Sequence, residues 1–205
     1  MKYRIGMIKK LKHIVLLLML LASTGAQAQT IGIKSNLLYD AFATVNLGVE
    51  MGLAPKWTLD LSGDFNAWNI SDTKKWKHWM VQPEARYWFC DRFSGHFLGV
   101  HGHVGQFNVG GMDLSALDLN SSKWPAGSSR KDSRDQGWFV GAGVGYGYSW
   151  ILNRHWNLEA ELGFGFAYTK FDRFDCTNCN QSKQPDQSHV YVGPTKAAIN
   201  LIYEF

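Results

Sequence analysis

Two pairs of residues in this sequence have the spacing of a reactive or metal-binding site. Glu159 and Glu161 lie two residues apart, so both carboxylates would point to one side of a strand, as in a general acid–base pair. His101 and His103 repeat that spacing and could bind a metal ion, although the sequence shows no third ligand. Any strand with a polar inner face produces the same spacing. We therefore expect interior carboxylates and hydrogen-bonded histidines, without a metal.

The cysteines indicate a disulfide rather than redox chemistry. Cys176 and Cys179 have the Cys-x-x-Cys spacing of redox motifs and of half a zinc site. The redox motif needs a strand followed by a helix, whereas the surrounding sequence predicts a loop. In an oxidising compartment a local disulfide between these two cysteines is the expected state. Cys90 stands alone and is expected at the opposite end of the molecule.

Residues 74–79 combine lysines, tryptophans and a histidine. Such mixtures occur in nucleic-acid-binding proteins, but they also anchor proteins at a membrane surface, where lysines extend towards the headgroups. A secretory leader favours the membrane, with lipopolysaccharide phosphates as a further counter-charge. The sequence contains no nucleophile elbow, phosphate-binding loop or complete metal motif. It therefore predicts neither an enzyme nor a cofactor.

The first 28 residues predict a secretory signal peptide. They include five basic residues, then nine apolar residues at 14–22, and end in the small-x-small segment 26–28. Without the leader, sixteen basic and seventeen acidic residues remain, so the charge gives no support for nucleic acid as a partner. Residues 29–205 suit one domain and contain no further apolar run long enough for a membrane helix.

Eight segments of the mature chain alternate between apolar and polar residues with the period of a β-strand. They are 31–42, 45–53, 57–68, 78–89, 96–109, 136–151, 156–170 and 189–205. Pro83 suggests a bulge or irregularity in the fourth segment, and conflicting phases suggest a bulge near 102–105 in the fifth. The first connection is very short, and the second, fourth and sixth are also short, whereas the loops at 69–77, 110–135 and 172–188 are longer.

This pattern predicts an all-β fold: an eight-stranded antiparallel up-and-down transmembrane β-barrel of the cell outer membrane. Such barrels carry girdles of aromatic residues at both membrane interfaces. The residues expected in the girdles are Trp57, Trp79, Trp138, Tyr146, Tyr148, Trp150, Trp156, Tyr168 and Tyr203. A soluble lipocalin-like barrel shows the same alternation with its apolar face turned inward. The aromatic positions favour the membrane protein.

The last segment supports the membrane interpretation. Ile199, Leu201, Tyr203 and Phe205 share one face of the predicted strand. This ending resembles the C-terminal signal by which outer-membrane barrels are handed to their insertion machinery. We therefore expect these four residues to act as an insertion signal.

The opposite faces of the same segments predict a charged interior. The residues expected there are Lys34, Asp40, Glu50, Asp60, Asp64, Glu84, Arg86, Glu159, Glu161, Lys196 and Glu204. Buried charges are tolerated only when they are paired and hydrogen-bonded, and eight strands leave an interior just wide enough for side chains. We therefore expect an ion-pair network that plugs the barrel, in preference to a proton or solute path.

Four segments resemble a domain-of-unknown-function family. They are 56–63, 74–79, 82–88 and 155–160, and the similarity extends over the mature chain. Members of this family are small predicted outer-membrane barrels of Gram-negative bacteria, often encoded near genes for fimbrial components. The resemblance implies an architecture and a setting, but no chemical activity.

The expected function is structural or adhesive, as a fimbria accessory that acts through the extracellular loops. The expected partners are outer-membrane lipid and lipopolysaccharide, the insertion machinery, and fimbrial or other surface proteins. Three alternatives stay open, because a fold alone does not supply a function. They are an outer-membrane lipid-modifying enzyme, a narrow channel, and a soluble periplasmic lipocalin-like carrier.

Overall fold

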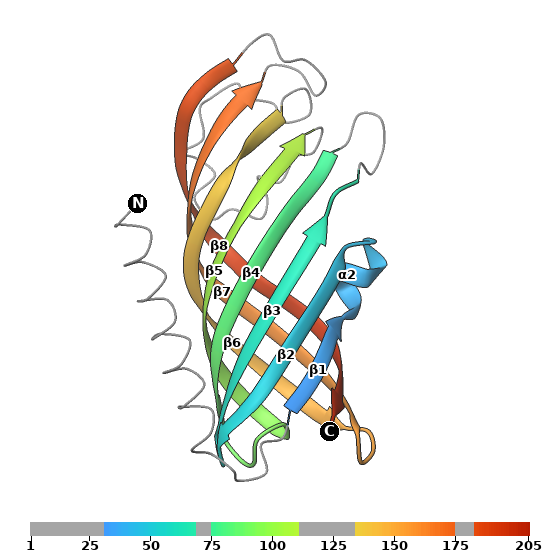
Figure 1. Cartoon of the computed structure of the whole chain (residues 1–205). Coiled ribbons are helices and arrows are strands. Elements are labelled where there is room, and N and C mark those ends of the chain that lie inside the picture. Colours follow the sequence, from blue (N-terminus) through green and yellow to red (C-terminus); the bar gives the residue numbers. More distant parts are fainter. Residues whose placement is uncertain (1–30, 69–74, 111–133, 175–182) are drawn as a thin grey trace, which may run out of the picture. The chain divides into compact units, whose positions relative to one another are not determined.

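The computed structural model describes residues 31–68, 75–110, 134–174 and 183–205. The chain divides into residues 1–30 and a second unit, 31–205; the predicted signal peptide lies outside the described residues. The described part of the second unit contains eight strands and one short helix (Figure 1). They are β1 (Ile31–Asn36), α2 (Leu37–Ala41), β2 (Val45–Ala54), β3 (Trp57–Asn66), β4 (Lys75–Trp88), β5 (Gly95–Gly110), β6 (Arg134–Ile151), β7 (Trp156–Phe174) and β8 (Lys183–Glu204).

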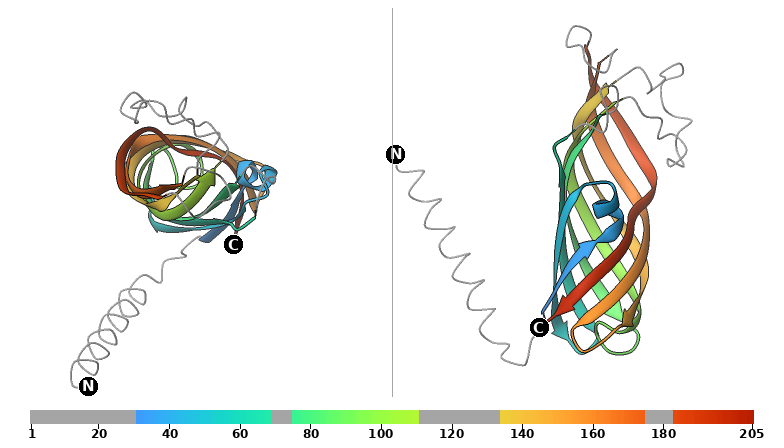
Figure 2. Two further views of the ribbon diagram at one scale, coloured as in Figure 1. Left: turned by 90° about the horizontal axis from the view of Figure 1, so that it is seen from above. Right: turned by 90° about the vertical axis from the view of Figure 1, so that its right-hand side faces the viewer.

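The eight strands form one closed sheet. Each strand pairs antiparallel with the next strand in the sequence, and β1 pairs with β8 to complete the ring. In that closing pair, Gly32 lies opposite Glu204 and Asn36 lies opposite Asn200. The ring is visible from above in the left panel of Figure 2. The predicted all-β fold of eight antiparallel strands is therefore confirmed.

The two ends of this sheet differ in their connections. The short β2–β3, β4–β5 and β6–β7 connections lie at the end where β1 begins and β8 stops, which we call the short-turn end (Figure 1). The β3–β4, β5–β6 and β7–β8 connections lie at the opposite end, which we call the loop end. Strands β7 and β8 extend far towards the loop end (Figure 2, right).

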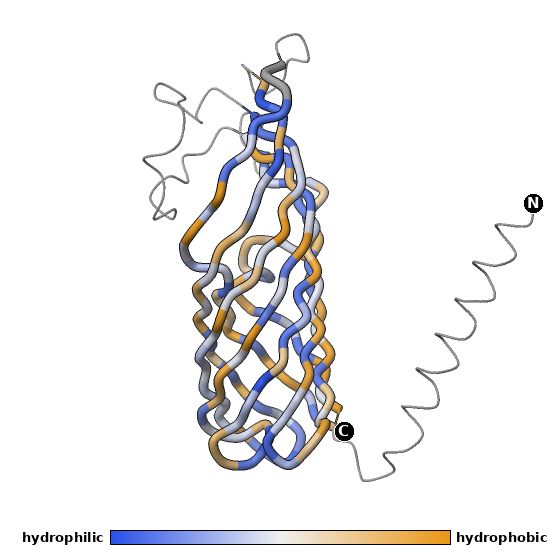
Figure 3. The backbone as a smooth tube through the Cα atoms, turned by 90° about the vertical axis from the view of Figure 1, so that its left-hand side faces the viewer, coloured by the Kyte–Doolittle hydropathy of each residue, from blue (hydrophilic) through white to orange (hydrophobic). Residues whose placement is uncertain are grey.

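Alternation along the strands separates the two faces of the wall. On β6, Val140, Val144 and Tyr146 are exposed, whereas Gly145 and Ser149 are buried. Hydrophobic and hydrophilic residues are accordingly interleaved along the tube in Figure 3. The interior, which we call the bore, holds buried polar and charged residues, and the outer face carries many exposed large apolar residues.

The first strand is shorter than predicted, because the chain turns into helix α2 after Asn36. The Asn36 side chain is the N-cap of this helix and accepts a hydrogen bond from the Leu38 backbone N–H at 3.1 Å. The prediction of a strand through residue 42 is therefore wrong beyond Asn36. Within the described segments, no helix has the length and apolar character needed to cross a membrane.

The irregularities predicted for the fourth and fifth strands are only partly present. The register of β5 is continuous against both neighbours, so the predicted bulge near 102–105 is wrong. Its phases conflicted because Phe97 and Phe107 lie on the same face as the buried residue His101. Pro83 leaves the register of β4 unchanged, although pairing with β5 is interrupted there, since proline has no N–H to donate.

A bulge that the sequence did not predict occurs in β8. Gly163 on β7 lies opposite Lys196, but the next residue, Phe164, lies opposite Pro194. Thr195 is therefore an extra residue in β8. As a result, the side chains of both Thr195 and Lys196 reach groups inside the bore.

Candidate functional site

Arg86 on β4 is the centre of an ion-pair network that crosses the bore. Its side chain is fully buried. Nε lies 2.6 Å from Glu84, and Nη2 lies 2.7 Å from Glu161. Nη1 lies 2.7 Å from Glu50 and 2.9 Å from Glu159. One planar guanidinium therefore joins β4 to β2 and β7, a role that the fork of arginine donors suits.

Two lysines extend the network to further strands. Lys34 Nζ on β1 lies 2.8 Å from Glu50 and 3.2 Å from Asp60 on β3. Lys196 Nζ on β8 lies 2.7 Å from Glu84. These contacts define the ion-pair network as Lys34, Glu50, Asp60, Glu84, Arg86, Glu159, Glu161 and Lys196. Six of the eight strands contribute to it.

The network is closed to solvent, and its carboxylates accept further hydrogen bonds. None of its eight side chains is more than 8 % exposed. Thr58 donates to Glu50 at 2.5 Å, and Asn200 donates to Glu159 at 2.7 Å. Removing one member of such a cluster leaves buried charge without its partner, which costs about 3–5 kcal/mol. The arrangement therefore locks the strands to one another.

Three of the predicted interior charges lie outside this network. Asp64 faces the bore nearer the loop end, where its Oδ1 lies 3.1 Å from His78 Nε2. Glu204 accepts a hydrogen bond from Asn157 near the short-turn end. The placement of Asp40 in the interior was wrong. Asp40 is an exposed residue of α2, because the helix replaces the strand alternation on which the prediction rested.

The bore is closed at the short-turn end by an apolar plug, which we define as Trp88, Phe93, Phe97 and Ile202. All four are at most 3 % exposed. The ring centroids of Trp88 and Phe97 are 4.7 Å apart, and the Arg86 guanidinium lies 4.5 Å from the Phe97 centroid. Phe93 comes from the β4–β5 turn, where it adopts a φ of 63°. The sequence interpretation missed this plug, although Trp88 shares the parity of Arg86.

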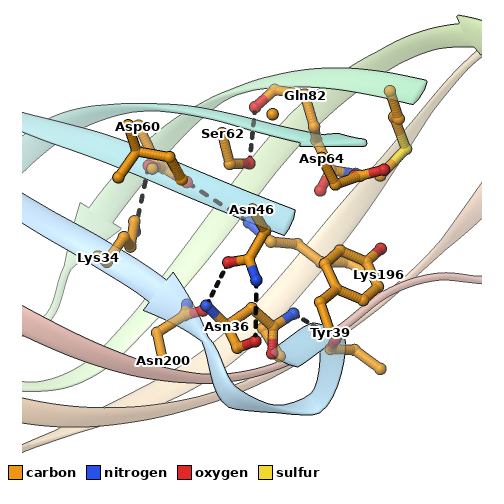
Figure 4. Close-up of a pocket in the computed structure, with 16 residues that line it drawn as sticks. Lys34, Asn36, Tyr39, Asn46, Asp60, Ser62, Asp64, Gln82, Lys196 and Asn200 are labelled. Atoms are coloured by element: carbon orange, nitrogen blue, oxygen red, sulfur yellow. Dashed lines mark hydrogen bonds and ion pairs between the residues drawn. The ribbon is translucent and has the colours of Figure 1, made fainter. Parts of the chain in front are cut away.

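A small pocket lies between the ion-pair network and α2 (Figure 4). Its volume of ≈ 30 Å³ has room for about two water molecules. Its lining includes Lys34, Asp60 and Lys196 of the ion-pair network and Tyr39 of α2. The pocket therefore lies between the charged interior and α2, the helical part of the described wall.

Helix α2 occupies the part of the wall where β8 has no strand partner on one side. β1 ends at Asn36, so its pairing with β8 stops at Asn200 (Figure 2, right). The Asn36 side chain replaces part of the missing ladder, because it donates to the Ala197 carbonyl and accepts from the Ile199 N–H, both at 3.2 Å. We call the boundary between α2 and residues 192–198 the seam.

His101 and His103 lie in the bore on the loop side of Arg86, and both are buried. His101 Nε2 lies 2.8 Å from Thr195 Oγ1, and its Nδ1 lies 3.5 Å from Glu84 Oε2. Among the described residues, no group of three or more His, Cys, Asp and Glu side chains is arranged to hold a metal ion. The contacts of His101 are thus with a hydroxyl and a carboxylate.

The residues of the predicted insertion signal lie on the closing strand. Ile199 and Phe205 are exposed, whereas Leu201 and Tyr203 are half-buried. The Tyr203 and Trp156 ring centroids are 5.1 Å apart. The last strand therefore presents a continuous aromatic and aliphatic stripe on the outer face.

The predicted disulfide falls on residues that the structure does not describe, because Cys176 and Cys179 lie within 175–182. Cys90 is an exposed free thiol in the β4–β5 turn. That turn belongs to the short-turn end, while residues 175–182 connect β7 to β8 at the loop end.

Comparison with known proteins identifies a family. No curated protein matches the chain. A family model described as "Protein of unknown function (DUF3575)" matches residues 14–205. The matched region contains every strand of the closed sheet and every residue of the ion-pair network, and it confirms the resemblance to an uncharacterised family. The chain therefore belongs to the DUF3575 family of proteins of unknown function.

Proposed function

We propose that this protein is an outer-membrane β-barrel with a sealed bore, which supports surface structures or adhesion through its loops. The observation that carries the proposal is an apolar outer face bounded by two aromatic bands. A wall that faces lipid needs such a face, because the bilayer core solvates apolar side chains and aromatic rings prefer its interfaces. Closure of the sheet also removes edges that lipid could not hydrogen-bond.

The aromatic band at the short-turn end consists of rings in mutual contact. The Trp57 and Tyr87 centroids lie 5.2 Å apart, and those of Tyr148 and Trp150 lie 4.8 Å apart. The second band lies towards the loop end. There Trp79 and Trp138 are exposed, and the Trp138 and Tyr168 centroids lie 5.9 Å apart. Both bands belong to the outer face.

The separation of the two bands matches a membrane. Trp138 and Trp150 are twelve residues apart on β6, and Trp79 and Tyr87 are eight apart on β4. With a rise of about 3.3 Å per residue and a strand tilt of about 40°, these separations correspond to roughly 30 and 20 Å. The apolar band of outer-membrane barrels is about 25 Å tall. The spacing therefore supports a bilayer-spanning wall.

The residues inside the bore favour a structural role over a narrow channel or a lipocalin-like carrier. The apolar plug and the ion-pair network place buried side chains across the bore between the short-turn end and His101, an arrangement that opposes the passage of a solute through that half. A lipocalin-like carrier needs an apolar interior for its ligand, whereas the network places eight charged side chains there. We infer a rigid stem that holds the loops in place.

The proposed partners follow from the position of each surface in a membrane. Lys75 and Lys77 on β4 lie just beyond Trp79 towards the loop end, where they would meet lipopolysaccharide phosphates. The outer-face stripe of the last strand, which ends in Phe205, would be bound by the insertion machinery. The link to fimbriae rests on the resemblance of the sequence to barrels encoded near fimbrial genes, and the secretory leader rests on the residue pattern of 1–28.

Membrane fractionation and semi-native gels test the proposal. We expect the protein in the outer-membrane fraction, with faster migration before heating than after heating in detergent. Recovery from the soluble periplasm would favour the carrier, and single-channel steps in planar bilayers would favour the channel. The accessory role predicts that deleting 111–133 reduces surface fibres or adhesion while the barrel still inserts. Unchanged fibres and adhesion in a complete deletion strain would contradict that role.

A further inference from the structure

We propose that Thr195, His101 and Glu84 form a hydrolytic site for carboxylic esters of apolar acyl chains, which reach it through the seam. This goes beyond the proposed structural role. Thr195 Oγ1 lies 2.8 Å from His101 Nε2, which is the contact expected between a nucleophile and its general base. His101 Nδ1 lies 3.5 Å from Glu84 Oε2 on the opposite side of the ring. A hydroxyl and a carboxylate therefore lie at the two nitrogens of one imidazole.

The β8 bulge creates the contact between the hydroxyl and the imidazole. In a regular strand Thr195 and Lys196 would point to opposite faces, yet Lys196 reaches Glu84 and Thr195 reaches His101. Bulges frequently re-aim side chains beside active sites. The extra residue thus adds Thr195 to an interior that already contained the charged residues.

Two glycines leave space for the same pair of side chains. A Cβ at Gly143 would lie 2.6 Å from His101 Nε2 and 2.7 Å from Thr195 Oγ1. A Cβ at Gly163 would lie 2.8 Å from His101 Cε1. Real Cβ atoms are not found so close to other heavy atoms. The wall on β6 and β7 is therefore built around the Thr195–His101 contact.

Glu84 acts as a positioning residue rather than as a group that touches substrate. Its carboxylate is held by Arg86 Nε at 2.6 Å and by Lys196 Nζ at 2.7 Å. The carboxylate lies at ion-pair distance from Nδ1 without a hydrogen bond to it, so its negative charge stabilises the imidazolium that forms when Nε2 takes a proton. The ion-pair network thus provides the rigid base on which the site rests.

The seam provides the route to Thr195 from the outer face. Gln82 lines the pocket beside α2, and its Nε2 lies 3.4 Å from the Thr195 carbonyl, so the pocket and Thr195 are neighbours. Thr195 itself is only half-buried. The pocket of ≈ 30 Å³ is too small for a chain. Substrate access therefore requires α2 to move, and Asp40 holds α2 through hydrogen bonds from Ser35 and Asn46, both at 2.8 Å.

The chemistry of the seam favours an acyl chain over a peptide strand. Its outer border is apolar, since Phe42, Leu47 and Val192 are exposed there. Two positions on the edge of β8 do not serve a new strand, because Asn36 donates to the Ala197 carbonyl and Pro194 has no N–H. An apolar chain needs no such groups. The substrate we infer is therefore the ester bond of a bilayer lipid.

The reaction consists of two balanced steps. Thr195 Oγ1 attacks the ester carbonyl carbon while its proton moves to His101 Nε2. The bond to the alcohol oxygen breaks, the alcohol takes that proton, and an acyl ester remains on Thr195. Water then attacks this ester and gives its proton to His101. Thr195 oxygen leaves with the proton, so that a carboxylic acid is released and the starting state returns.

The test is hydrolysis of p-nitrophenyl decanoate by the full-length mature chain refolded in detergent. We expect wild-type protein to hydrolyse the ester, and Thr195→Ala and His101→Gln to reduce the rate by about 100-fold or more. Thr195→Ser should retain activity, because serine supplies the same hydroxyl. Thr169→Ala, which removes a threonine bonded to the His189 carbonyl, is the matched control and should leave the rate unchanged.

A second readout separates chemistry from stability. Mass spectrometry of the acid-quenched wild type should find a decanoyl group on the peptide that contains Thr195, and Asp40→Ala should raise the rate by releasing α2. Each variant is compared only if it keeps heat-modifiable migration. No hydrolysis by the folded wild type, or an unchanged rate in folded Thr195→Ala, would overturn the site. Either result would leave the proposed barrel intact, because the migration assay reports that separately.

Discussion

The two halves of the barrel solve the problem of filling a bore in different ways. In the short-turn half all eight strands are paired, and the bore is packed with the apolar plug and the ion-pair network. In the loop half β1 is absent and α2 stands in its place. There the bore is lined by Phe107, Phe139 and Phe171; the Phe107 ring centroid lies 6.2 Å from that of Phe139 and 6.3 Å from that of Phe171. An open hollow of ≈ 610 Å³ lies at the rim of this half, lined by residues of both faces of the wall.

This difference predicts that the two halves contribute differently to folding stability and to local motion. Because β1 ends at Asn36, β8 loses ladder hydrogen bonds only on the loop side of that residue. There the Asn36 side chain and α2 supply local hydrogen bonds instead. Most of the ion-pair network lies where the ring is complete, although Asp135 and Arg173 form a further buried pair at 2.8 Å in the loop half. Such pairs persist only where good geometry offsets their desolvation. We therefore expect substitutions in the short-turn half to affect folding, and those near the seam to affect motion and access.

The largest effect is expected from Arg86→Ala. This change leaves Glu50, Glu84, Glu159 and Glu161 without their shared cation in a closed interior, at a cost of about 3–5 kcal/mol. The folded, heat-modifiable form should be lost in refolding assays. Arg154→Ala in the exposed β6–β7 turn is the matched control. A folded Arg86→Ala protein with wild-type stability would show that the network is dispensable.

The next effect concerns membrane insertion at the same end. Changing Tyr203 and Phe205 to Asp places charge on the outer stripe of the closing strand, which lipid and the insertion machinery would reject. We expect outer-membrane levels to fall strongly, with degradation in the periplasm, as measured by immunoblots of cell fractions. Leu152→Asp, an exposed change in a nearby turn, is the control. Normal surface levels of the double variant would contradict the membrane assignment.

A paired comparison of aromatic residues tests the two halves directly. Trp88→Ala removes a fully buried ring and its hydrogen bond to Thr58 at 2.9 Å, and we expect a loss of about 3–5 kcal/mol. Phe107→Ala removes a half-buried ring in the loop half and should cost clearly less. Urea unfolding of both variants in lipid vesicles measures the difference. Equal losses would remove the proposed distinction between the halves.

The smallest effect is expected at the seam. Asp40→Ala removes two hydrogen bonds that hold α2, each contributing about 1 kcal/mol. Global stability should change little, but backbone amides of 37–44 should exchange with deuterium faster than in the wild type. Exchange in β6 serves as the internal reference. Unchanged exchange at 37–44 would show that other contacts fix α2.

The prediction from sequence was strongest where alternation alone decides the structure. Seven of the predicted strands overlap the observed strands closely, and the first fails only where Asn36 starts a helix. That failure also misplaced Asp40. An asparagine that caps a helix and one that lies in a strand look identical in a hydrophobic pattern. The choice depends on contacts with Asn46 of the neighbouring strand and with β8, and β8 approaches only when the ring closes.

The candidate site was predictable in composition but not in connectivity. Parity placed Arg86 and the glutamates in the interior, yet nothing in the sequence showed that Arg86 would contact four of them. Phe93 was assigned to a connection, since no pattern shows that a turn folds back into the bore. The His101–Thr195 contact depends on the bulge in β8. A bulge shifts the alternation by one residue, so the alternating pattern alone does not predict that Thr195 faces the bore.

The sequence by itself determined the strands, their order and which face of each is polar, because side chains of a strand alternate strictly and the chain has two unlike faces. Tertiary structure alone decided which charges pair, where apolar side chains plug the bore and where a helix replaces a strand in the wall. Those outcomes depend on the stagger with which β1 meets β8. That stagger is set by closing the ring, which brings together residues more than 160 positions apart.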